Sequence, residues 1–148
     1  MNANALPSEV SAIVGVVDPD ANAAGAVSSA WVAMADFESI MAIVMAGTLG
    51  TSATLDAKLE QATDSSGTGV KDISGKAITQ LVKATNDDDQ AIINCRAEDL
   101  DLANDFTHAR LTMTVGTATS DCAGIVIGFN ARRMPTDGED LASVVEIV

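Results

Sequence analysis

The sequence predicts an all-β fold: a single-domain antiparallel β-sandwich, jelly-roll-like, with an extended N-terminal arm and a C-terminal tail. Three observations carry this prediction. Apolar and polar residues alternate strictly in several segments, turn residues separate the segments at intervals of roughly ten residues, and the clearest segments lack helical spacing. The chain of 148 residues is long enough to bury one sizeable core.

The first expected elements are an arm and a strand. Residues 1–8 are small and polar, which is typical of a flexible N-terminal arm. Glu9 to Val17 is rich in β-branched residues and ends at Asp18-Pro19-Asp20, so it predicts a strand. A loop is expected over Ala21 to Gly25. The sandwich domain is expected to span residues 9–134.

Two later segments consist almost entirely of apolar residues. Ile40 to Gly47 is far shorter than the roughly 20 residues of a membrane span and predicts a buried strand. Ala123 to Phe129 is apolar at successive positions, which predicts a strand covered on both faces.

Strict alternation marks the clearest strands. Ser52 to Gln61 and Thr107 to Val115 place apolar residues at every second position, and Gln90 to Ala97 shows the same pattern more briefly. Glu98 to Leu102 is expected to form one short helical turn, whereas Lys76 to Lys83 fits either a strand or a helix.

The composition excludes several functions. The net charge is −13, and the basic residues form no stripe, which argues against binding to nucleic acid or to an anionic membrane. Aromatic residues make up only 3% of the chain, so platforms for bases, sugars or flat cofactors are scarce, and no cofactor is expected. The start of the chain has no charged, apolar pattern of a secretory signal.

The chain is poor in residues that catalyse reactions, so we expect no enzyme and no catalytic residue. Its one histidine, His108, lies on the polar side of an alternating segment, and no serine or cysteine lies in a recognisable nucleophile motif. A surface or interface histidine is expected. Cys95 and Cys122 are expected to be reduced and buried, with a bridge between them as the alternative.

Three segments resemble ligand sites superficially. Asp18 to Asn22 opens like a calcium loop, but Ala23 and Ser29 stand where that loop needs glycine and glutamate, so a solvated turn is expected. Acidic residues at 87–89, 99 and 101 are expected to lie in hydrated loops rather than around a metal. Gly69 to Lys76 has the wrong spacing for a phosphate loop.

A set of residues is expected at an interface with another subunit. Trp31 is the clearest aromatic anchor. Arg132 and Arg133 are either a solvated strand end or partners of an acidic patch such as Asp137 to Asp140 of a neighbour. The tail, residues 135–148, ends in apolar residues expected to dock on the domain or on a neighbour. The full set is Leu6, Trp31, Arg132, Arg133, Leu141, Val144, Val145 and Ile147.

Several stretches between Trp31 and about Arg133 resemble small virion proteins encoded among the head genes of tailed bacteriophages. The resemblance is carried by Trp31 to Glu38, Ala53 to Asp64, Lys71 to Leu81, Arg96 to Asp101 and Phe106 to Thr112. It implies a setting and transfers no site residues. Some proteins of this kind resemble cement or decoration proteins, which sit on the outer face of the capsid lattice, commonly as trimers at local threefold axes. Motifs of the small decoration protein of lambdoid phages are not seen.

The expected function follows from the inert composition and this resemblance together. We expect a virion protein on the surface of the capsid head, whose partners are the major capsid protein and further copies of itself as a homotrimer. One alternative is a tail or head–tail joining protein. Another is a carbohydrate- or receptor-binding β-sandwich module, which would need exposed aromatic residues.

Overall fold

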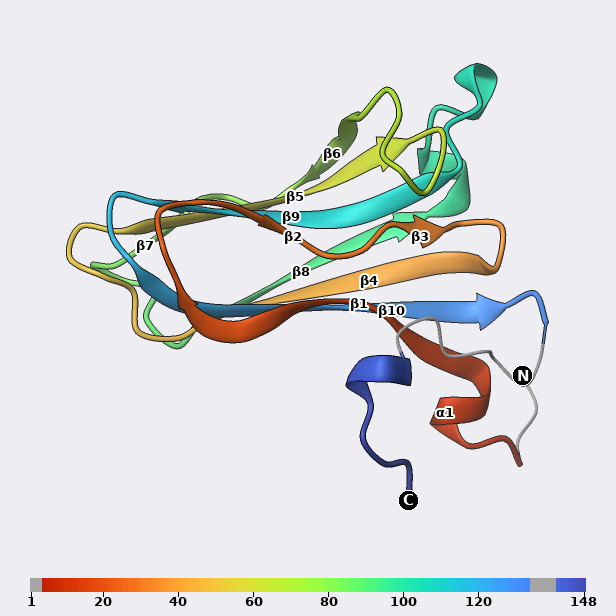
Figure 1. Ribbon diagram of the computed structural model, residues 1–148, viewed down its shortest axis with the longest axis horizontal. Helices are drawn as coiled ribbons and strands as arrows, with labels where there is room; N and C mark the ends of the chain where they lie inside the picture. Colours follow the sequence, from red (N-terminus) through yellow and green to blue (C-terminus); the bar gives the residue numbers. More distant parts are fainter. Residues whose placement is uncertain (1–3, 134–140) are drawn as a thin grey trace.

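Two antiparallel sheets face each other across one core in the computed structural model, which describes residues 4–133 and 141–148 (Figure 1). The first sheet has the order β1-β10-β4-β8. Its strands are β1 (Ser11–Asn22), β10 (Ser120–Ala131), β4 (Phe37–Ala46) and β8 (Gln90–Arg96).

The second sheet has the order β2-β9-β5-β6, with two short strands added to it. Strand β3 (Val32–Ala33) pairs with β9, and β7 (Leu81–Val82) pairs with β5. The four longer strands are β2 (Gly25–Ser28), β9 (His108–Gly116), β5 (Thr54–Ala62) and β6 (Lys71–Ala77).

The strand pairs define a jelly roll. Strand β1 pairs with β10, β2 with β9, β4 with β8, and β5 with β6, as in one long hairpin rolled up into two sheets. This arrangement confirms the predicted all-β antiparallel sandwich, and the alternating segments around residues 52–61, 90–97 and 107–115 are confirmed as strands β5, β8 and β9.

The core lies between the sheets because each strand turns alternate side chains inward. Its largest fully buried strand residues come from both sheets: Phe37, Ile40, Leu55, Leu59, Leu111 and Met113. Two glycines of β10 bring the sheets together. A Cβ at Gly124 would lie 2.6 Å from Leu111, and one at Gly128 would lie 2.5 Å from the Phe37 ring.

Helical structure in the described part of the chain is confined to single turns. Helix α1 (Pro7–Val10) precedes β1, and η1 (Ala97–Asp99) and η2 (Leu102–Asn104) link β8 to β9, which confirms the short helical turn expected near residue 100. A last turn, η3 (Leu141–Ser143), opens the C-terminal segment. No helix of the described chain is long and apolar enough to span a membrane.

The prediction for residues 18–25 is wrong in part. Strand β1 continues through Asp18-Pro19-Asp20 to Asn22, where a solvated turn and a loop were expected. The register shifts between Val17 and Asp20, and β1 lies at the edge of its sheet. An edge strand with a bulge accommodates proline, which has no N–H to donate to the ladder.

The prediction that Ala123 to Phe129 is covered on both faces is also wrong within one chain. Ile125, Ile127 and Phe129 point away from the core and are only half-buried. The ambiguous segment from Lys76 to Lys83 contains the end of β6 and the whole of β7, so it is extended. The junction at residues 134–135 lies outside the described residues, and the domain boundaries there stay a prediction.

Candidate functional site

His108 begins β9, half-buried, between Ala33 and Ala62 of the neighbouring strands. Its Nδ1 atom lies 2.9 Å from the Thr107 hydroxyl, which donates its one proton to the Thr63 carbonyl at 3.0 Å. The imidazole is therefore the donor at Nδ1. His108 is therefore held by a threonine hydroxyl, and Asp64 also interacts with it electrostatically.

The two cysteines are free and buried on the inner side of the first sheet. Burial, with a smaller effect from the charge of Asp99, raises the pKa of Cys95 to about 11. Burial likewise raises the pKa of Cys122. Cys95 lies opposite Ile40 and Cys122 opposite Ala46 on β4, six residues or about 20 Å apart, which excludes a bridge.

The acidic residues near η1 and the β7–β8 loop hold turns together. The Lys83 ammonium and the Leu49 N–H bind Asp87 and lower its pKa. The Arg96 N–H and then Lys76 lower the pKa of Asp99. Within residues 4–133 and 141–148, no three His, Cys, Asp or Glu side chains are grouped as metal ligands.

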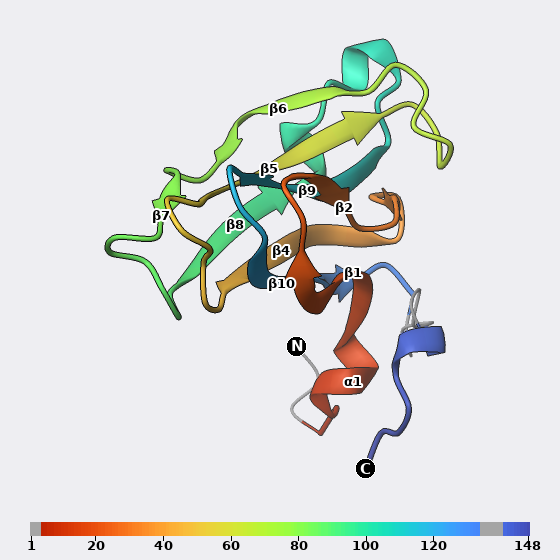
Figure 2. The same cartoon turned by 60° about the vertical axis from the view of Figure 1, so that its left-hand side comes forward.

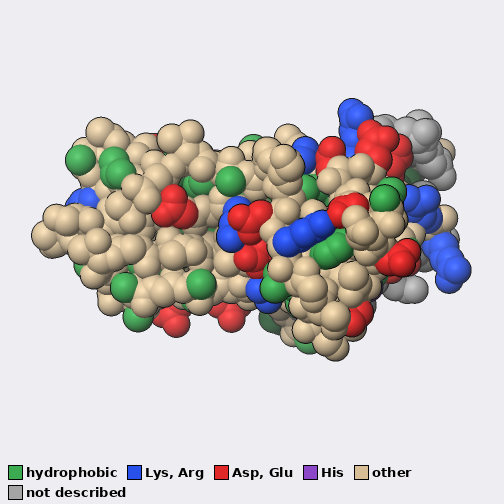
Figure 3. All heavy atoms as spheres, turned by 90° about the horizontal axis from the view of Figure 1, so that it is seen from above, with side chains coloured by type: hydrophobic (Ala, Val, Ile, Leu, Met, Phe, Trp, Pro, Cys, Tyr) green, Lys and Arg blue, Asp and Glu red, His purple; other side chains and the backbone are tan. Residues whose placement is uncertain are grey.

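Charged side chains on the outer side of the second sheet form one connected network. Glu60 on β5, with its side chain 12% exposed, accepts hydrogen bonds from Arg110 Nε at 2.9 Å and from the Thr112 hydroxyl at 2.8 Å. Lys58 bridges Glu60 at 3.3 Å and Asp72 of β6 at 2.6 Å. Figure 3 shows red and blue side chains side by side on this side of the molecule. Because these charged side chains are paired with one another at the surface, this side of the sheet needs no further partner to be stable in water.

Trp31, the expected aromatic anchor, packs within the chain. The Arg110 guanidinium carbon lies 4.5 Å from the centre of its ring. A Cβ at Gly67, where φ is +83°, would lie 2.9 Å from the indole nitrogen, so the β5–β6 loop also closes against the ring. Trp31 is half-buried and lies on the second sheet, away from the chain ends.

The structure brings the two chain ends together. Helix α1 and η3 lie next to each other on the side of the first sheet that faces away from the second sheet (Figures 1 and 2). Leu6 and Ile147 are each 61% exposed, Val145 is fully exposed and Val144 is half-buried. Leu141 begins η3, and the exposure of its side chain lies outside what the structure describes.

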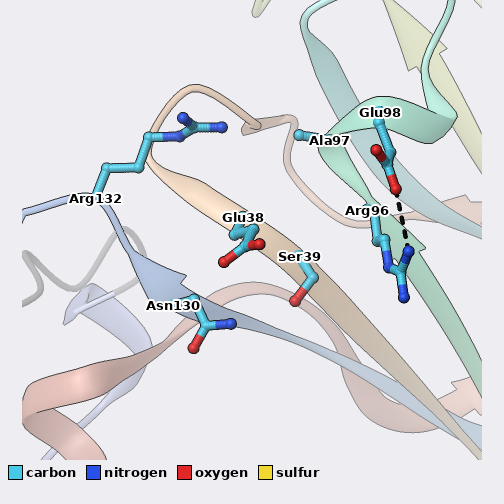
Figure 4. A pocket seen from close by; sticks show the side chains of 7 residues that line it. All are labelled: Glu38, Ser39, Arg96, Ala97, Glu98, Asn130 and Arg132. Atoms are coloured by element: carbon cyan, nitrogen blue, oxygen red, sulfur yellow. Dashed lines mark hydrogen bonds and ion pairs between the residues drawn. The ribbon is translucent and has the colours of Figure 1, made fainter. Parts of the chain in front are cut away.

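Arg132 and Arg133 follow β10 and are exposed. Arg132, Glu38, Asn130 and Arg96 line a hollow of about 610 Å³ at this end of the sheet (Figure 4). Arg96 is held there by Glu98 at 3.1 Å. Neither Arg132 nor Arg133 makes an ion pair with another described residue, and the Asp137 to Asp140 patch lies outside those residues.

A broad apolar surface on the outer side of the first sheet was missed by the sequence analysis. Residues directly opposite each other form rows across the sheet, and the row Val16, Ile125, Ile43, Ile92 is apolar on all four strands. Ile92 is 57% exposed and Met45 38% exposed, and the other large side chains are half-buried. We call this surface the apolar face: Ile13, Val16, Met41, Ile43, Met45, Ile92, Ala123, Ile125, Ile127 and Phe129.

Strand β10 has small residues on the side that faces the core and larger apolar residues on the side that faces away from it. Its inward positions include Gly124 and Gly128, whose missing side chains leave room for residues of the core. Its outward positions are Ile125, Ile127 and Phe129, which are larger. In the sequence, both alternating sets of residues in this segment are apolar, which could have indicated a second covered surface.

No protein-family model matches the chain, and no curated protein matches it. Solved structures that align with it include naturally occurring empty particles of cowpea mosaic virus, at 12% identity and TM-score 0.44, covering 88% of this chain and 89% of that chain. An empty virus-like particle of the same virus aligns at 14% identity and TM-score 0.42, over 93% and 88%. Broad bean stain virus aligns at 9% identity and TM-score 0.45, over 95% and 98%.

These likenesses are too distant to carry a statement about function, and the fold assignment rests on the strand order. The fold and the site define a class: a jelly-roll sandwich with one polar, internally paired outer side, and with an apolar outer side that the chain ends adjoin.

Proposed function

We propose that the chain is a non-enzymatic virion protein that binds the outer face of a tailed-phage capsid lattice and stabilises the head as a cement protein. The observation that carries this proposal is the gathering of exposed apolar side chains of the chain ends, Leu6, Val145, Ile147 and Val148, on one side of an otherwise chemically inert sandwich. Exposed apolar ends bury surface only against a neighbour.

Two further observations support it. The buried thiols have raised pKa values, and the His108 ring is hydrogen-bonded to the Thr107 hydroxyl, so these residues have structural roles that suit a virion protein. The resemblance to phage head-gene products supplies the setting, a shell of major capsid protein, and implies three copies of this chain around a local threefold axis. Many weak contacts repeated over a lattice add up to strong restraint.

A binding module for sugars has less support. Phe37 and Phe106 are buried, and Trp31 stacks on Arg110, so three of the four aromatic side chains are already engaged within the fold. The fourth, Phe129, is half-buried in the apolar face.

The test compares particles made with and without the chain. Particles from which the gene is deleted should lose DNA at a lower temperature or lower salt than wild-type particles, and added purified chain should restore them. A chain carrying Val145→Ser and Ile147→Ser should occupy particles less, whereas the matched control Thr114→Ser, on the polar side, should occupy them fully. The proposal would be overturned if purified particles lacked the chain, or if a tagged copy of the chain were found on tails and not on heads.

A further inference from the structure

Among the described residues the apolar face is only partly covered, although its composition is that of a covered surface. Its central row has Val, Ile, Ile and Ile on four adjacent strands, as in the packed interior of a sandwich. Arg96 is the one charged residue in the rows formed by Ser11 to Val16, Ser39 to Met45, Gln90 to Arg96 and Ala123 to Phe129. We propose that the apolar face is the contact surface between two copies of this chain, packed sheet against sheet.

Strand β10 provides the first argument. Its glycines face the core and its isoleucines face outward, an arrangement that a strand exposed to water on its outer side would not need. Bulky β-branched residues on a flat sheet bury most area against another flat sheet of the same kind, about 10 Å away. A second copy presents that surface.

The area of the face is consistent with a weak pair. Four strands about 4.8 Å apart, each contributing six to seven residues at about 3.4 Å, cover about 400 Å² of flat area per copy. A stable interface buries about 800 Å² per partner.

Charge fixes how the second copy is oriented. One end of the face adjoins Arg132 and Arg133, with Glu38 also exposed nearby. The other end holds a hollow of about 530 Å³ lined by Met45, Ala123, Asp20 and Asp121. A twofold axis across the strands brings the arginine end of each copy to the acidic hollow of the other, whereas an axis along the strands would place like ends together.

The chain ends require the same orientation. Helix α1 directly precedes Ser11, so it and the neighbouring η3 lie near the arginine end of the face (Figures 1 and 2). With the two sheets reversed relative to each other, the two α1 helices lie at opposite ends of the pair and do not meet each other. The open rows around Ile43 and Ile92 then meet in the middle.

The test measures the mass of the purified chain in solution by light scattering during size-exclusion chromatography, over a range of concentrations. A mass rising to twice the 15.1 kDa of one chain is expected. Ile92→Lys should weaken the pair at least tenfold, because it places a charge in the central row of the face, on strand β8. Ile92 is mostly exposed, so the variant should fold, which circular dichroism verifies.

The matched control is Thr114→Lys, which adds the same charge on the outer side of the second sheet and should leave the association unchanged. A charge exchange tests the orientation. Replacing Arg132 and Arg133 with Asp should weaken the pair, and adding Asp20→Arg and Asp121→Arg to the same chain should restore it. The restored association distinguishes reversed packing from any other use of the face.

Each remaining outcome counts against the inference. A chain that stays monomeric at the highest soluble concentration, a mass of three chains as the phage resemblance implies, or a pair indifferent to Ile92→Lys would overturn it. The inference does not depend on the proposed function: a pair formed by a chain that is missing from particles leaves it intact, and a monomeric chain that still occupies capsids refutes it alone.

Discussion

The two sheets are similar inside and opposite outside. On β2-β9-β5-β6, outward residues such as Lys58, Glu60 and Arg110 are linked to one another, so the surface is complete within one chain. On β1-β10-β4-β8, outward residues such as Ile43 and Ile92 have no such counterpart and are left partly in water. Both sheets alternate inward and outward side chains in the same way. They differ in the outward residues, which are charged and paired on the second sheet and apolar on the first.

The largest expected effect concerns the inner side of β10. Gly128→Ala should lower the free energy of unfolding by about 3 kcal/mol, because the new Cβ would stand 2.5 Å from the Phe37 ring. Ile127→Ala, its neighbour on the outer side, should cost about 1–2 kcal/mol in the monomer, where the side chain is only partly buried. Urea unfolding followed by circular dichroism measures both. Equal costs would mean that β10 does not differ between its two sides as described.

A smaller effect is expected from the polar outer side. Glu60→Ala removes the shared acceptor of Arg110 and Thr112 and should destabilise the fold by about 2 kcal/mol. Asp56→Ala is the matched control on the same strand and side, where the exposed carboxylate accepts from Gln80, and it should cost less than about 1 kcal/mol. The same unfolding assay decides. A negligible cost for Glu60→Ala would show that the network adds nothing.

The sequence predicts which side of a strand faces the core only where one side is apolar and the other is polar. Ser52 to Gln61 alternates cleanly, so it predicts both a strand and the side that faces the core, and β5 confirms both. Ala123 to Phe129 is apolar in both phases, so its pattern predicts a strand without showing which side is inside. The deciding fact is that Gly128 packs over Phe37, a contact between residues far apart in sequence.

Features of the candidate site could be predicted from the sequence only where they depend on single residues and not on contacts between distant ones. The exposed apolar tail residues Val145 and Ile147 stood out in the sequence. The role of Trp31 did not, because nothing in the sequence places Arg110 and Gly67 against its ring. The apolar face was missed because its rows join four strands whose order is set by the jelly-roll topology.

The next smaller effect is a loss of stability in acid, which comes from Glu60 on the polar outer side of the second sheet. Burial would raise the pKa of Glu60, but hydrogen bonds from Arg110, Thr112 and Lys58 outweigh it and leave the pKa below its ordinary value of 4.5. A group with a lowered folded-state pKa stabilises the fold above its unfolded pKa and loses that contribution as pH falls through the folded one.

Stability should therefore hold from neutral pH to about 5 and decline below the ordinary pKa of 4.5. Thermal unfolding at several pH values measures the decline. Because Asp64, Asp87, Asp99 and Asp101 also have lowered pKa values, Glu60→Ala should reduce the acid sensitivity without abolishing it. An unchanged pH profile in that variant would contradict the assignment to Glu60.

The smallest effect is expected at Trp31. Trp31→Leu removes the stacking on Arg110 and should cost about 0.5–1 kcal/mol, the range for a cation–π contact at a partly exposed site. Arg110→Ala in the same background should then cost less than it does alone, because the two residues share one contact. A double-mutant cycle measures this coupling, and strict additivity would remove the contact from the description of the polar side.

The placement of three side chains gives the molecule its own set of probes. The single tryptophan lies on the second sheet, against β9 and the β5–β6 loop, and both thiols lie on the inner side of the first sheet. Fluorescence during unfolding thus follows the loosening of one layer, and the reactivity of the thiols toward a colorimetric reagent follows exposure of the other. The two signals together show whether both layers loosen at the same time as the native chain unfolds.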